Sequence, residues 1–171
     1  MTDLSQPIDN TKPAIVVSAY QHLAHALRQF EVRHCVSILG RSEVAQRGWP
    51  DFENRALLRL EFDQAPSAEQ IGALIRFARD WGGRGNLLIH CRAGTARSPA
   101  AAMIAAATLP QTDAEVLSRV VQAKSYFRPN TRMLELADTI LQRKPSLIEI
   151  LRSTYQPDRL DGWAPVRVPL A

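Results

Sequence analysis

Apolar positions along the chain recur with two different spacings, and segments of the two kinds alternate. Short runs of β-branched and leucine residues predict strands, whereas apolar residues spaced three or four positions apart predict helices. The expected strands cover residues 14–18, 34–39, 56–62 and 86–90, and the expected helices cover 20–30, 67–81, 99–109, 112–123, 130–141 and a short segment from 146. This alternation predicts a three-layer α/β fold, in which helices flank a central, mostly parallel sheet of four to five strands.

Polar residues mark where the helices start and where the regular pattern stops. Side-chain caps are expected at Ser67, Thr112, Asn130 and Ser146. Residues 41–54 are polar and contain glycine and proline, so this segment is predicted to be a loop. Residues 155–171 contain three prolines and no periodicity, which predicts an irregular C-terminal tail. We therefore expect one domain over residues 1–171, with its core in about 13–150.

Composition narrows the class of protein. A chain of 171 residues that is 46% hydrophobic can bury a sizeable core. The longest apolar run, residues 99–109, is about half of the ~20 residues that a membrane span requires, so no membrane span is expected. Residues 1–12 are polar and acidic rather than signal-like, and with only two cysteines this favours a cytoplasmic location. The pattern does not predict an oligomeric state.

The formal net charge of +4 suits an anionic substrate. The arginines are scattered along the chain, and no motif interleaves aromatic with basic residues, so nucleic acid is not an expected partner.

The most informative stretch, residues 90–98, reads His-Cys-Arg-Ala-Gly-Thr-Ala-Arg-Ser between an expected strand and an alanine-rich helix. A helix N-terminus and the tight turn before it direct several N–H groups at one point, which favours an anion there. Gly94 gives this turn conformational freedom, and Arg97 offers a planar fork for two phosphate oxygens. The same positive field favours the thiolate form of Cys91. The predicted phosphate-binding residues are Arg92, Ala93, Gly94, Thr95, Ala96 and Arg97.

Two neighbours of this stretch have supporting roles. Ser98 can donate its hydroxyl to the Cys91 sulfur, and His90 can fix the loop through its ring N–H. The alternative is a buried strand cysteine followed by an ordinary turn. The spacing and the strand and helix context together favour the catalytic interpretation.

These residues resemble the signature of the protein tyrosine phosphatase superfamily, His-Cys-(five residues)-Arg-Ser/Thr, and the Arg-Ser ending is similar to the dual-specificity branch. Arg128-Pro129-Asn130 is similar to a later segment of that branch, whose asparagine braces the phosphate loop. The likeness is greatest to compact bacterial phosphatase-like proteins and covers about residues 13–150. It implies a single phosphatase-like domain, with Asn130 supporting the loop.

Two aspartates compete for the role of general acid. Asp51 lies in Trp-Pro-Asp-Phe, which matches the acid loop of the large tyrosine-specific phosphatases, and Asp63 directly follows an expected strand. Sites in open α/β sheets form at the carboxyl ends of strands, and parallel neighbouring strands would bring Asp63 and Cys91 to one edge. The superfamily usually places one helix and one strand between acid and nucleophile, as here after Asp63. We therefore predict Asp63 as the acid and Trp49-Pro50-Asp51 as a surface turn.

The sequence as a whole predicts a cysteine-dependent phosphomonoesterase of the protein tyrosine phosphatase type that works through a phosphocysteine intermediate. Its catalytic residues would be Cys91, Arg97, Asp63 and Ser98, and its substrate a phosphorylated protein or a small phosphate monoester. Three alternatives stay open. Arg92 beside the nucleophile is typical of phosphoinositide and inositol phosphate phosphatases, and similar cysteine loops occur in sulfurtransferases, arsenate reductases and non-catalytic pseudophosphatases.

The remaining cysteine and the paired histidines suggest no further chemistry. Cys35 lies in a β-like run and is predicted to be buried, with a reversible disulfide to Cys91 as the alternative. His22 and His25 have helical spacing but no carboxylate or thiol nearby, so no metal site is predicted there. The expected mechanism needs no metal or other cofactor.

Overall fold

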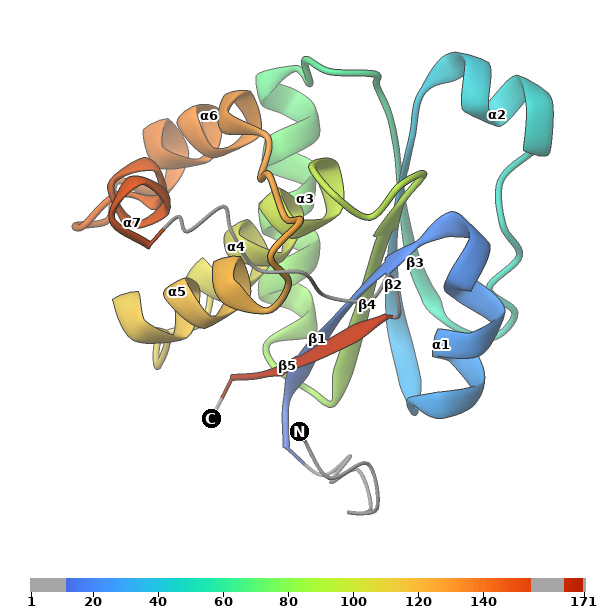
Figure 1. Ribbon diagram of the computed structural model, residues 1–171, viewed down its shortest axis with the longest axis horizontal. Helices are drawn as coiled ribbons and strands as arrows, with labels where there is room; N and C mark the ends of the chain where they lie inside the picture. The colour runs from blue at the N-terminus through green and yellow to red at the C-terminus, as the bar shows by residue number, and fades with distance from the viewer. Residues whose placement is uncertain (1–11, 155–164, 171) are drawn as a thin grey trace.

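The computed structural model describes residues 12–154 and 165–170, and its centre is a five-stranded sheet (Figure 1). The strands are β1 (Ala14–Ala19), β2 (Val32–Leu39), β3 (Ala56–Glu61), β4 (Asn86–Cys91) and β5 (Val166–Pro169). Their order is β3-β2-β4-β1-β5, and all neighbours pair in parallel except β5, which runs antiparallel to β1. The four predicted strands and the mostly parallel sheet are therefore confirmed.

Helices cover both faces of this sheet. They are the 3-10 turn η1 (Tyr20–His22), α1 (Leu23–Gln29), α2 (Arg41–Arg47), α3 (Ala68–Trp81), α4 (Arg97–Ala107), α5 (Ala114–Gln122), α6 (Thr131–Leu141) and α7 (Leu147–Thr154). One side of the sheet carries α3 to α7, and the other carries α1 with α2 above it (Figure 1). None of these described helices is long and apolar enough to cross a membrane.

The alanine-rich helix α4 is buried along most of its length. Every residue from Ala100 to Ala106 has no exposed surface, and the helix contacts α3, α5, α6 and strands β1 and β4. Small side chains permit this close approach on all sides. Since α4 starts at the end of the 91–97 loop, a helix that is buried on all sides supports the predicted site.

The segment 41–54, predicted as a loop, contains helix α2, so that prediction is wrong. The carboxylate of Glu43 accepts a hydrogen bond from Gly40 N–H at 2.7 Å and caps the helix, and Gly48 ends it with φ of 69°. No residue of α2 is buried. A helix that buries no face carries no apolar period, which is why the pattern missed it.

Two more expectations need correction. The expected irregular tail contains β5, in which Val168 is buried, while residues 155–164 and 171 of that tail lie outside the described part. The fifth helix is capped by Asp113, whose side chain accepts from Val116 N–H at 2.9 Å, and not by Thr112. The caps at Ser67, Asn130 and Ser146 are present as predicted.

Candidate active site

The candidate site lies where the parallel strands end. Cys91 closes β4 and Asp63 follows β3, but β2 separates these two strands, so they are not the direct neighbours considered above. Both residues nevertheless line one pocket of about 530 Å³, together with Gln64, the 93–97 loop and residues 129–132. The carboxyl ends of parallel strands lie at the same edge of a sheet whether or not the strands are adjacent. Asp63 and Cys91 therefore lie close together, as expected.

Cys91 lies at the base of this pocket under a tight loop. Gly94 has φ of 72°, and its N–H donates to Cys91 Sγ at 3.2 Å. A Cβ on Gly94 would lie 2.9 Å from the backbone nitrogen of Ala19, so the loop can pack directly on the end of β1 only with glycine here. The buried hydroxyl of Ser98 is 3.2 Å from the same sulfur. Two donor groups therefore face Cys91 Sγ.

Arg97 is held over the pocket by groups from two other elements. Its Nη1 donates to the backbone oxygen of Phe62 at 3.1 Å, and its Nη2 donates to both oxygens of Glu43 at 2.8 and 2.9 Å. The two charged side chains are only 12% and 11% exposed. Burial by itself raises the pKa of Glu43, but the hydrogen bonds from Arg97 and from Gly40 N–H hold that pKa below its ordinary value. Glu43 is therefore an anionic anchor for Arg97.

Sequence reasoning missed Glu43. It lies 54 positions before Arg97, in the segment taken for a loop, and neither its spacing nor its neighbours connect it with the cysteine loop. The one available signal was local: a glycine followed three positions later by glutamate can start a capped helix.

Asp63 packs against the backbone at the start of α2. A Cβ added to Gly40 would lie 1.9 Å from Asp63 Oδ1, whereas the φ of −79° at Gly40 suits any residue. Gly40 is thus needed for space and not for backbone freedom. The same short turn therefore touches Asp63 through Gly40 and Arg97 through Glu43.

The competing aspartate lies elsewhere. Asp51 is exposed and does not line the pocket of Cys91. Its neighbour Phe52 is buried beside the His90 ring, with 5.8 Å between ring centroids, and Trp49 stacks with Arg59. The Trp-Pro-Asp segment is thereby anchored by its aromatic residues to the sheet, and the carboxylate faces solvent.

His90 is buried beneath the loop and joins two strands. Its Nε2 is 2.6 Å from Ser37 Oγ on β2, and Tyr20 and Phe52 flank the ring. Burial lowers the pKa of His90 to about 4, so the ring is neutral at physiological pH. The ring contact runs to the neighbouring strand β2, at the base of the loop.

Asn130 connects three parts of the site. Its Oδ1 caps α6 at Met133 N–H, its backbone N–H donates to Ala96 oxygen at 3.1 Å, and its Nδ2 donates to Gln64 oxygen at 2.8 Å. The support that the resemblance implied for the phosphate loop therefore comes from the backbone of Asn130. The side chain supports the turn that carries Asp63.

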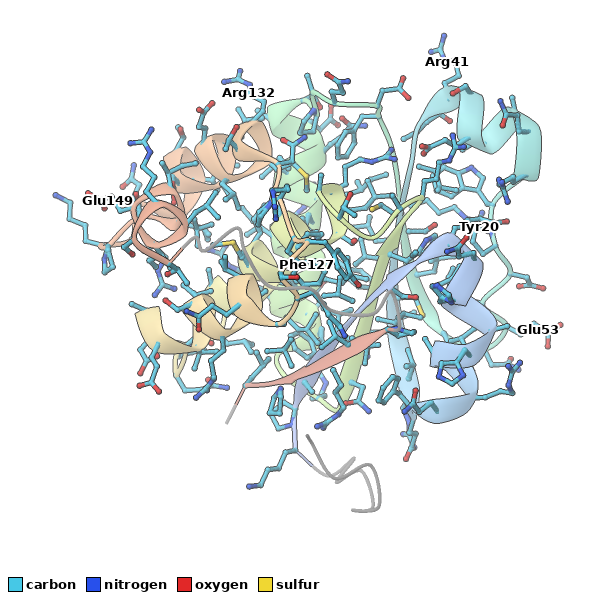
Figure 2. All side chains as sticks on the ribbon, viewed as in Figure 1. Tyr20, Arg41, Glu53, Phe127, Arg132 and Glu149 are labelled. Atoms are coloured by element: carbon cyan, nitrogen blue, oxygen red, sulfur yellow. The ribbon has the colours of Figure 1, made fainter. Side chains whose placement is uncertain are left out.

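The remaining loop residues divide between two hollows. Ala93, Thr95 and Ala96 line the pocket of Cys91, and Arg132 projects from α6 at its rim (Figure 2). The side chain of Arg92 instead lines an adjoining pocket, which Ala93 shares.

The two cysteines are too far apart for a disulfide. Cys35 pairs in register with Leu88, three residues before Cys91, which corresponds to ~10 Å along the strand. Cys35 also belongs to the small core beside α1, whereas Cys91 belongs to the large core on the opposite face. Burial raises the pKa of the Cys35 thiol to about 12. The alternative of a redox pair is therefore wrong, and Cys35 is a buried structural cysteine.

Comparison with known proteins shows which solved structures have a similar fold. No protein-family model and no curated protein match the sequence. The structure is similar to that of DUSP15 (18% identity, 86% of this chain and 96% of that one, TM-score 0.56). It is also similar to PTPMT1 in complex with PI(5)P (17% identity, 84% and 96%, TM-score 0.55) and to a human tyrosine phosphatase-like serine/threonine/tyrosine-interacting protein (15%, 72% and 84%, TM-score 0.51). Across most of its length the chain therefore has the predicted dual-specificity phosphatase fold.

Proposed function

We propose that the protein is a cysteine-dependent phosphomonoesterase. One observation carries the proposal: the Cys91 sulfur faces two donors at the base of a pocket that Asp63 and Arg97 also line. A shared fold does not by itself imply catalysis, because one of the similar structures is named only as phosphatase-like. The chemistry of these particular side chains is what supports an enzyme.

The first step transfers the phosphoryl group to sulfur. Backbone N–H groups of the 92–97 loop and the guanidinium of Arg97 bind the three non-bridging phosphate oxygens. The contacts to Phe62 and Glu43 leave further N–H groups of Arg97 for this purpose. The Cys91 thiolate attacks phosphorus, a sulfur–phosphorus bond forms, and the ester bond breaks as Asp63 gives its proton to the leaving oxygen.

The second step returns the enzyme to its starting state. Asp63, now a carboxylate, takes a proton from a water molecule as that water attacks the phosphocysteine. The sulfur–phosphorus bond breaks, inorganic phosphate leaves, and the Ser98 hydroxyl stabilises the departing thiolate by a hydrogen bond. Ser98 is already 3.2 Å from Sγ, so this donor requires no rearrangement.

Phosphotyrosine is the side chain whose hydrolysis we propose to test first. The walls formed by residues 63–64 and 129–132 enclose about 530 Å³, which has room for an aryl ring above the loop. A simple aryl phosphate tests whether the protein hydrolyses phosphate esters at all, independently of which natural substrate it prefers.

The test compares aryl phosphate hydrolysis by the wild type, Cys91→Ser and Cys35→Ala. We expect the first substitution to abolish turnover, because a serine hydroxyl is a poor nucleophile here, and the second to retain it. Wild-type turnover that survives in Cys91→Ser would overturn the proposal. So would phosphopeptide binding without any hydrolysis, or thiosulfate–cyanide sulfur transfer as the main activity.

The acid is assigned by a second pair of variants. With a poor leaving group, Asp63→Asn should lower kcat by ~10²-fold or more, and Asp51→Asn should leave it nearly unchanged. The reverse pattern would show that Asp51, although exposed in this structure, is the proton donor.

A further inference from the structure

A second pocket adjoins the one that contains Cys91. It measures about 380 Å³ and is lined by Ala19, Tyr20, Gln21, Arg47, Arg92 and Ala93. Ala93 lines both pockets, so the two are neighbours on the same loop. The mechanism proposed above uses nothing from this second pocket except the backbone of residues 92 and 93.

Backbone contacts fix the position of this second pocket relative to the phosphate loop. Tyr20 N–H donates to Arg92 oxygen at 3.0 Å, and the missing side chain of Gly94 lets the loop pack on Ser18 and Ala19. Figure 2 shows Tyr20 at the junction of β1 and η1, on the side of the sheet that carries α1 and α2. A ligand group in the second pocket would therefore be held at a constant distance from the Cys91 sulfur.

Two guanidinium groups give this pocket a positive charge. Arg47 at the end of α2 lies over the Tyr20 ring, 5.6 Å from its centroid, which orders a long side chain at the pocket wall. Arg92 comes from the loop itself. Within residues 12–154 and 165–170, neither arginine forms an ion pair.

Glu43, the carboxylate on which Arg92 acts, does not neutralise this charge. Arg92 acts electrostatically on Glu43, but both oxygens of Glu43 already accept from Arg97. Two arginines, Arg97 and Arg92, thus act on this one carboxylate, and Arg97 occupies both of its oxygens. A pocket lined by two guanidinium groups favours an anionic ligand.

From this arrangement we infer that the preferred substrate carries a second phosphate on the same compact scaffold as the scissile one, as in a polyol bisphosphate. The inference rests on the proposed phosphomonoesterase activity. Because Ala93 lines both pockets, the second pocket lies beside the one that contains Cys91. A substituent next to the scissile phosphate on a small ring can therefore reach it. A phosphotyrosine peptide would hold its other anionic groups farther away, beyond the length of the tyrosyl ring. The bisphosphate can be a free polyol or a lipid headgroup.

The experiment compares wild type, Arg47→Gln, Arg47→Lys and the control Arg28→Gln, which removes an exposed arginine on α1. The substrates are an aryl phosphate, an inositol monophosphate, the matching vicinal inositol bisphosphate, and the bisphosphate lipid in phosphatidylcholine vesicles. Wild type should show kcat/KM roughly 10-fold higher for a bisphosphate than for the monophosphate, because the second phosphate adds one charge-assisted hydrogen bond. Arg47→Gln should remove this preference and keep aryl phosphate turnover, Arg47→Lys should restore part of it, and Arg28→Gln should behave as wild type.

The outcomes separate the two proposals. If the vesicle substrate shows the preference and the free bisphosphate does not, the second phosphate belongs to a lipid headgroup; the reverse identifies a free polyol. Equal losses on all substrates in Arg47→Gln, no preference for either bisphosphate, or a preference only for doubly phosphorylated peptides would overturn the second-phosphate inference. If wild type hydrolyses nothing, the proposed function fails. Calorimetric binding of the bisphosphate that is lost in Arg47→Gln would then still support the second pocket as an anion-binding site.

Discussion

Asp63 and Arg97 of the candidate site both contact residues 40–43, a turn that enters the segment predicted as a loop. Gly40 makes room for Asp63, and Glu43 holds Arg97. At the scale of single residues, the meeting of Cys91, Arg97 and Asp63 in one pocket could be predicted because the Cys-x5-Arg spacing and the end of a strand are local signals. Their supports could not, because contacts between residues 40 or 43 and residues 63 or 97 exist only after folding.

Gly40→Ala should displace the Asp63 carboxylate, because the new methyl group would occupy the position next to Oδ1. We expect kcat to fall by ~10²-fold on a poor leaving group and by much less on a good one, which is the signature of a misplaced general acid. Gly72→Ala is the matched control: its methyl group would meet only the end of the flexible Arg76 side chain, so activity should persist. Equal losses on both leaving groups would contradict this assignment.

Glu43→Gln keeps the shape of the Arg97 anchor and removes its charge. The arginine would then be a buried cation without its counter-charge, so we expect a loss of stability of roughly 3 kcal/mol and a clear rise in KM with lower kcat. Glu61→Gln breaks an exposed pair with Arg41 instead, and should change stability by less than ~1 kcal/mol. Urea unfolding and steady-state kinetics of the two variants measure both effects. An unchanged kcat/KM in Glu43→Gln would show that Arg97 keeps its position without the charge of Glu43.

At the scale of elements, the strands and the buried helices were predictable because their apolar residues repeat at the period of the element. Helix α2 buries no apolar face, and strand β5 is too short and too rich in proline to show a period. Both are stabilised by what they pack against or pair with, and such partners leave no trace in a local window of sequence.

Helix α4 allows a stability test of its tight packing. Ala102 has no exposed surface, so Ala102→Leu inserts three carbons where there is no space and should cost roughly 1–3 kcal/mol. Ala107→Leu, at the half-buried end of the same helix, is the control and should cost much less. Thermal or urea unfolding compares the two. If both variants lose the same stability, the close packing around α4 does not explain why its side chains are small.

At the scale of the whole molecule, His90 links stability to pH. Its pKa is about 4 in the folded protein, against an ordinary value of 6.5. The unfolded chain therefore binds the proton more readily, so stability is full above pH 6.5 and falls as the pH drops toward 4, by roughly 3 kcal/mol in total. Glu43, whose pKa is lowered, adds its own loss only at more acidic pH.

The free energy of unfolding between about pH 7 and about pH 5 reports on His90 together with His34, whose pKa burial and Arg84 also lower. His90→Gln should reduce the dependence on pH in this window, whatever its effect on absolute stability, and leave the smaller contribution of His34. His25→Gln on the exposed face of α1 should leave the slope as in wild type. A wild-type stability that does not change across this window would contradict a neutral, buried His90.

By itself, the sequence determined the class of fold, the cysteine loop and the position of Asp63 at the strand edge that also carries Cys91, because period, capping and strand-end position are properties of neighbouring residues. Only the tertiary structure decided which groups hold that loop: Glu43 on Arg97, Gly40 against Asp63, Asn130 on the acid turn, and two arginines in an adjoining pocket. Each of these contacts joins residues far apart in the chain. Their energy depends on distance and burial in space, and spacing along the sequence carries neither.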